Sequence, residues 1–195
     1  MVSGLQTLAL EVYSLCITNN ISLCSAWVPR DNNQAADALS KTIDPDDWSV
    51  SDRIFKYFTK VYGPFSLDVF ANNHNSKCNT FFSRWWCEGS SGIDAFCHSW
   101  EKHYCWIVPP PNLLTRVILF CLKHKVKGIL IFPRWESAAF WPLLFPQGKL
   151  LKGFSIVQEF RRPSNFFVPG PFRNNIFSCH TFSGDVIALK IDCQD

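Results

Sequence analysis

The chain has 195 residues, which fits one medium-sized domain, or one domain with appendages. Hydrophobic residues make up 47% and charged residues 18%, so the composition excludes an intrinsically disordered chain. The formal net charge of +3 is compatible with a nucleic-acid partner but does not by itself indicate one.

The cysteines and the chain start predict an intracellular protein, either cytoplasmic or nuclear. There are 9 cysteines, an odd number, and the opening "MVSGLQTLALEVYSLC" lacks the basic first region of a secretory signal. We therefore expect reduced thiols. No apolar run approaches the roughly 20 residues of a membrane helix, so we expect a soluble chain without a membrane partner.

The first third of the chain predicts helix, strand and helix. Apolar residues recur at helical spacing over 4–18, and "ISLCSAWV" has the composition of a strand that ends at Pro29. Asn32 or Asn33 is a suitable cap for a helix through "QAADALSK". A polar linker then leads into a helix over 47–60.

The next part predicts strands separated by a helix. We expect strands in "FSLDVFA", "TFFS", "GIDAF", "HYCWIV" and "KGILIFP", a helix in "NLLTRVILFCLKHK" and a short helix in "WESAAFWPLL". The order strand, helix, strand predicts an α/β fold with a mostly parallel sheet. Beyond residue 151, "GFSIVQEF" and "DVIALKID" predict two further strands.

Open parallel sheets bind ligands at the carboxyl ends of their strands. The predicted strand ends carry Asp68 and Asn72, then Val108-Pro109-Pro110-Pro111, then Arg134-Trp135. The alternative is that the prolines only terminate strands and Asp68 caps a turn.

A zinc site is the weaker interpretation of the histidines and cysteines between positions 74 and 105. None of their spacings is the C-x₂-C or H-x₃₋₅-H arrangement that lets residues of one turn share an ion. No cysteine lies in an activating context, and no glycine-rich phosphate loop is present.

Two stretches carry a resemblance to a known group of proteins. "ISLCSAWVPRDNNQAADALSK" resembles the C-terminal end of the ribonuclease H domain in retroelement polyproteins. There a strand and Pro-Arg lead into a helix whose Asp, matched here by Asp37, belongs to a carboxylate cluster that holds two divalent metals. The family's other acids lie upstream of this stretch, so the resemblance implies an orphan carboxylate and no metal site in this chain alone.

The second stretch, "YGPFSLDVFANNHNSKCNTFFSRW" with "GIDAFCHSW" and "HYCWIVPPPNLLTRVI", resembles the Dam-like DNA adenine methyltransferase segment of DIRS-type retrotransposons. The resemblance implies a Rossmann-like fold and S-adenosylmethionine as cofactor, with Asp68 and Asn72 near it. The family motif Asp/Asn-Pro-Pro-aromatic reads Val108, Pro109, Pro110 and Pro111 here. Val cannot accept the hydrogen bond of the adenine amine, and Pro111 lacks the stacking ring.

The resemblance implies a retrotransposon polyprotein fragment in four parts. These are a ribonuclease H remnant at 1–41, a linker helix at 42–61, a Dam-like domain at 62–150 and a strand-containing tail at 151–195. The preferred interpretation is a degenerate methyltransferase fold that binds DNA or an RNA–DNA hybrid through Arg84, Arg116, Arg134 and Trp135, without a cofactor. The alternative is an active adenine methyltransferase that uses S-adenosylmethionine.

Overall fold

A computed structural model describes residues 2–34, 48–169 and 182–193, and the chain separates into two compact units, Met1–Thr42 and Ile43–Asp195. Among the described residues, no helix has the length and apolar character that a membrane crossing requires.

The first unit contains the predicted N-terminal helix, α1, over Val2–Thr18. It also contains a short 3-10 helix, η1, over Arg30–Asn32. The strand predicted in "ISLCSAWV" is wrong: residues 21–28 form no ladder, because the described part of this unit offers no second strand with which they could pair. The helix predicted over 34–41 lies outside the described residues except for Gln34, and Asp37 lies outside them as well.

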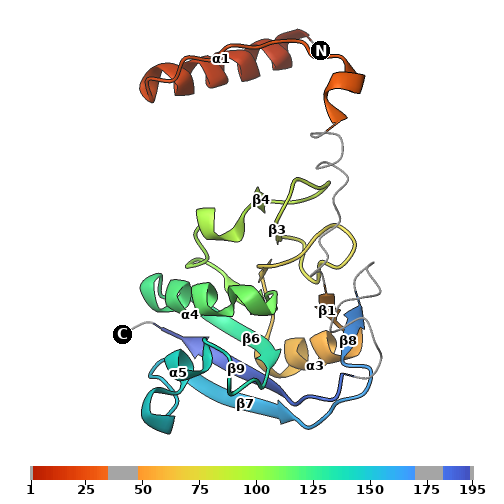
Figure 1. Ribbon diagram of the computed structural model, residues 1–195, viewed down its shortest axis with the longest axis vertical. Helices are drawn as coiled ribbons and strands as arrows, with labels where there is room; N and C mark the ends of the chain where they lie inside the picture. Colours follow the sequence, from red (N-terminus) through yellow and green to blue (C-terminus); the bar gives the residue numbers. More distant parts are fainter. Residues whose placement is uncertain (1, 35–47, 170–181, 194–195) are drawn as a thin grey trace. The chain divides into compact units, whose positions relative to one another are not determined.

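The second unit is built on a five-stranded sheet in the order β2-β5-β6-β9-β7 (Figure 1). The strands span Leu67–Asp68, Tyr104–Ile107, Lys127–Pro133, Val186–Asp192 and Phe154–Phe160 in that order. All five coincide with apolar segments that predicted strands. The two strands after residue 151 are thus part of the same sheet as β2, β5 and β6.

The prediction of a mostly parallel sheet was wrong, because the sheet is mixed. β5 is parallel to β2 and β6, but β9 is antiparallel to both of its neighbours, β6 and β7. The antiparallel ladders are the longer ones: β6 and β9 pair along their whole lengths, from Lys127–Asp192 to Pro133–Val186. The strand-helix-strand order of residues 104–133 predicts only the direction of β5 and β6, and carries no information on where β9 inserts.

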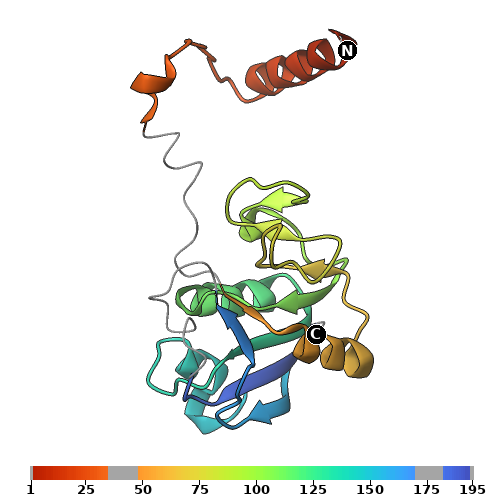
Figure 2. The same ribbon diagram turned by 90° about the vertical axis from the view of Figure 1, so that its right-hand side faces the viewer.

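A second, short parallel pair lies beside β2. β3, Phe82–Ser83, pairs with β4, Gly92–Ile93, and a parallel bridge joins Asp68 to Phe81. The views in Figures 1 and 2 place β3 and β4 at the end of this unit that is remote from β7 and from the short helix α5, Trp141–Leu144. Because β4, β3, β2, β5 and β6 are joined by parallel pairs and by this parallel bridge, their carboxyl ends all face the same way.

Helices cover both faces of the sheet because the strand residues alternate between two apolar clusters. Trp106, Ile129 and Ile131 pack with α3, Asp52–Tyr62, on one face. Their neighbours Ile107 and Leu130 pack on the other face with α4, Leu114–Lys123, and α5, Trp141–Leu144. The 3-10 helices η2, η3 and η4 span Ala95–Cys97, Pro111–Leu113 and Pro146–Gly148.

Three helices are shorter than predicted, although α4 lacks only two of the predicted residues at each end. The residues before α3 form a strand, β1, over Trp48–Val50, because they pair with β8, Phe167–Pro169. The helix predicted over 135–144 is restricted to the four residues of α5.

Ser51 stands at the N-cap of α3, but its hydroxyl is buried and donates to no described residue. We expect Ser51→Ala to change the free energy of unfolding by less than about 0.5 kcal/mol, whereas removal of a working cap costs about 1 kcal/mol. Urea unfolding followed by tryptophan fluorescence measures this. Asp94→Ala is the matched control, since Asp94 does accept a cap hydrogen bond from Phe96 N; a loss of 1 kcal/mol or so in the Ser51 variant would contradict the assignment.

Candidate functional site

Most of the side chains that the sequence singled out lie at the carboxyl ends of the parallel strands, spread along one edge of the sheet. Asp68 is the last residue of β2, and its register partner is Trp106 on β5, two residues before Val108. Arg84 follows β3, and Arg134 follows β6. This edge is where open α/β sheets bind ligands.

Asp68 is buried, with 3% of its surface exposed. Its carboxylate accepts hydrogen bonds from the backbone N–H of Lys77, at 2.9 Å, and from that of Phe70. Burial nevertheless outweighs these bonds and raises the pKa of Asp68 to about 7. Burial, together with the charge of Asp68, raises the pKa of the Cys78 thiol to about 12. Asp68 thus holds Lys77, at the far end of the loop that follows β2, against the end of that strand.

Asn72 shapes the start of that loop. Its side-chain oxygen accepts from the N–H groups of His74, at 2.8 Å, and Asn75, at 3.2 Å. Its own N–H donates to the side-chain oxygen of Asn75 at 2.7 Å. The Lys77 ammonium closes the loop onto α3 through an ion pair with Asp52, which lowers the pKa of Asp52. Loop 72–77 is therefore held from both ends.

The Val108-Pro109-Pro110-Pro111 segment joins β5 to α4. Val108 is 5% exposed and belongs to the apolar cluster that contains Trp106, Ile129 and Ile131. Pro110 precedes η3, and its carbonyl accepts from Leu113 N at 2.9 Å. The Val108 side chain offers this position apolar packing and no hydrogen-bond acceptor.

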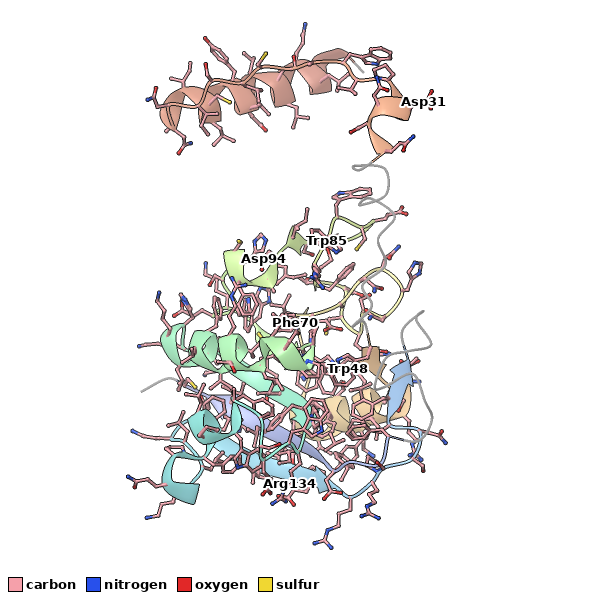
Figure 3. The ribbon with its side chains drawn as sticks, in the orientation of Figure 1. Asp31, Trp48, Phe70, Trp85, Asp94 and Arg134 are labelled. Carbon is pink, nitrogen blue, oxygen red and sulfur yellow. The ribbon has the colours of Figure 1, made fainter. Side chains whose placement is uncertain are left out.

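The predicted nucleic-acid contacts do not form one patch. The guanidinium of Arg116 lies 3.8 Å from the centre of the Phe96 ring, and that of Arg84 lies 5.4 Å from the Trp85 ring. Arg134 is at the opposite end of the unit from Trp85 (Figure 3). It forms ion pairs with Glu136, at 2.8 Å, and Glu159, at 3.5 Å, so its charge is partly balanced. Its neighbour Trp135 packs against both apolar clusters.

Asp94 is a residue of this edge that the sequence reasoning missed. It follows β4 directly and has a left-handed backbone, with φ 53°. Its carboxylate accepts from Phe96 N at 3.2 Å and from the Cys97 thiol at 3.6 Å. In the sequence, the feature that could have indicated Asp94 is its position as an acid directly after the short extended run "GI". A non-glycine residue in this conformation is uncommon and is often found at functional sites.

Over residues 2–34, 48–169 and 182–193, no group of three His, Cys, Asp or Glu side chains is placed to hold a metal ion. The thiols of the described part are free, and Cys105, Cys121 and Cys193 are buried.

Comparison with known proteins identifies the family. A family model described as DNA N-6-adenine-methyltransferase (Dam) matches residues 38–142, which is more than half of the chain. The match includes β2, the loop fixed by Asp68, and the whole of β5, α4 and β6. No curated protein matches the chain. The chain belongs to the DNA N-6-adenine-methyltransferase (Dam) family.

Proposed function

We propose that this chain is a Dam-family domain that has lost adenine methylation and acts by binding nucleic acid. The burial of Val108 among Trp106, Ile129 and Ile131 is the observation that carries the loss of methylation, and the match to a DNA methyltransferase family supports DNA as the partner. The family chemistry needs a polar side chain here to accept a hydrogen bond from the adenine amine. A valine packed into an apolar cluster supplies none, and the proline at position 111 supplies no stacking ring.

The part of the edge near Asp94 and Phe70 fits S-adenosylmethionine better than the Val108–Pro111 segment fits adenine. Asp94 has a half-buried carboxylate that accepts from N–H and S–H donors, and the nucleoside of the cofactor presents amino and hydroxyl groups of the same kind. Phe70 contributes an aromatic ring next to Phe96. Asp94 and Phe70 would contact the cofactor, which supplies a methyl group when bound, and Asp68 and Asn72 would support it by fixing the loop after β2. An active adenine methyltransferase is the second candidate function on this ground.

The proposal places the chain in a retrotransposon polyprotein of the DIRS type. This rests on the likeness of residues 21–41 to the end of a retroelement ribonuclease H, followed directly by the Dam-family segment. Asp37 would be the remaining carboxylate of the metal site, which needs further acids from elsewhere. The parts would be 1–41, 42–61, 62–150 and 151–195, with the remainder of the polyprotein as partner.

Methylation assays on DNA, with titration calorimetry of S-adenosylmethionine, test the proposal. We expect no methyl transfer by the natural chain, and salt-sensitive binding to DNA. The double variant Val108→Asp with Pro111→Tyr restores the family motif, and Pro111→Tyr alone is the control. Because an Asp at position 108 enters an apolar cluster, thermal unfolding must first show that the variant is folded.

Methyl transfer by the natural chain would contradict the proposal and establish the active enzyme. Transfer gained only by the double variant would show that the part of the edge near Asp94 and Phe70 is intact and that the loss lies at positions 108 and 111. A folded natural chain with neither methyl transfer nor DNA binding would overturn the binding function.

A further inference from the structure

The connection between β3 and β4, residues 84–91, carries two adjacent tryptophans on its surface. Trp85 is 52% exposed and Trp86 is 78% exposed, whereas Trp100 and Trp106 are fully buried. Figure 3 shows Trp85 in the same part of the unit as Asp94. Large exposed indoles contribute little to folding, and exposed apolar surface of this kind marks contacts with other molecules.

Hydrogen bonds hold both ends of this connection, so the indoles lie on an anchored segment. The Ser83 hydroxyl donates to the Ser90 hydroxyl at 2.7 Å, and the Ser90 hydroxyl donates to the carbonyl of Gly92 at 2.9 Å. The N–H of Ser91 donates to the carbonyl of Phe81 at 2.9 Å. These bonds tie both ends of the connection to the sheet, and the segment between them projects the indoles outward.

A positively charged side chain, Arg84, lies next to the Trp85 indole. The guanidinium of Arg84 lies 5.4 Å from the centre of the Trp85 ring and is exposed. Flat aromatic faces beside a guanidinium are what unpaired nucleic-acid bases require, because the rings stack on the bases and the cation faces the phosphates. Much of the rest of the connection is polar, with Glu88, Ser90 and Ser91, which suits a wet nucleic-acid contact better than an apolar protein interface.

We propose that Trp85, Trp86 and Arg84 form a stacking site for unpaired bases of single-stranded DNA. This inference rests on the proposed nucleic-acid binding and gives it a location and a preferred form of the partner. The site lies at the carboxyl edge of β3, the same edge at which β5 presents its prolines. A base that is out of the duplex stack would meet the indoles there.

The test is fluorescence anisotropy of a labelled 12-nucleotide oligothymidylate and of a 12-base-pair duplex, with the full chain. We expect the natural chain to prefer the single strand, and Trp85→Ala with Trp86→Ala to weaken that binding by roughly tenfold or more. The slope of log Kd against log salt should stay unchanged in this variant, because indoles carry no charge. Arg84→Ala should reduce the slope by about one phosphate contact.

Two further variants serve as controls. Tyr57→Ala removes an exposed aromatic residue of α3, 43% exposed, and should leave the affinity unchanged. Trp85→Phe with Trp86→Phe retains the stacking rings and should keep Kd within about threefold of the natural value. Circular dichroism verifies that every variant is folded.

The outcomes separate this inference from the proposed function. Natural affinity in the double alanine variant, with binding intact in the natural chain, would overturn the stacking site and leave the binding function standing. An equal loss of duplex binding would overturn the preference for unpaired bases. No binding of either DNA by the natural chain would overturn both.

Discussion

Gly128→Ala is expected to lower the free energy of unfolding by about 4 kcal/mol or more, a large part of the roughly 5 to 15 kcal/mol by which an ordinary domain is stable. Gly128 lies in β6 opposite Cys105 of β5. A Cβ atom built on Gly128 would lie only 2.0 Å from the backbone oxygen of Cys105, which cannot move without breaking the ladder. The residue also has φ at 155°, which L side chains rarely adopt.

Gly148→Ala is the matched control for this prediction. Gly148 also has a positive φ, 76°, but a Cβ there would meet nothing within 4 Å. We expect this variant to lose only about 1 kcal/mol, the ordinary cost of a left-handed alanine. Urea unfolding followed by tryptophan fluorescence measures both. Equal losses in the two variants would show that φ, and not the contact with Cys105, makes Gly128 necessary.

The individual strands and helices were largely predictable, because each is coded by a local apolar pattern. α1, α4, β5 and β6 lie within a few residues of their predicted positions. The arrangement of the strands was not predictable. β9 inserts antiparallel between β6 and β7, and nothing within "DVIALKID" specifies which strands become its neighbours.

The candidate site was predictable in its positions but not in its environments. The sequence alone places Asp68 and Val108 at the ends of strands and shows that Val108 departs from the family motif. It does not show that Lys77, nine residues further on, returns its N–H to Asp68. Trp85 and Trp86 illustrate the opposite failure: apolar residue type predicts burial, yet both are exposed because the closed β3–β4 connection faces outward.

The burial of Asp68 predicts an unusual dependence of stability on pH. The pKa of Asp68 rises from 3.8 to about 7 in the folded chain. Below about pH 4 the carboxyl is protonated in both states. Between about pH 4 and pH 7 the unfolded chain releases this proton while the folded chain keeps it, so the free energy of unfolding should fall by roughly 1.4 kcal/mol per pH unit. Above pH 7 both states are ionised and this contribution is constant.

Asp68→Asn should remove this slope, because an amide does not titrate and its oxygen still accepts from Lys77 N. The measurement is urea unfolding of both chains at one-unit steps from pH 4 to pH 8. From pH 4 to pH 8 the natural chain should lose roughly 4 kcal/mol of unfolding free energy relative to the variant. A difference that stays constant with pH would show that Asp68 is ionised in the folded chain at pH 4.

Asp52→Asn is the control of opposite sign. The hydrogen bond and charge of Lys77 lower the pKa of Asp52, so its contribution is stabilising above its unfolded pKa and is lost as the pH falls. Asp52 is exposed, so the effect should be small. Lys77 contacts both acids, Asp52 through its ammonium group and Asp68 through its backbone N–H. Opposite pH trends in the two variants would show that the acids have different roles. Asp52 would stabilise the loop through its charge, whereas Asp68 would be a buried acid that keeps its proton to near neutral pH. A buried acid of this kind lowers stability at neutral pH, and strongly shifted acids of this kind occur most often at functional sites.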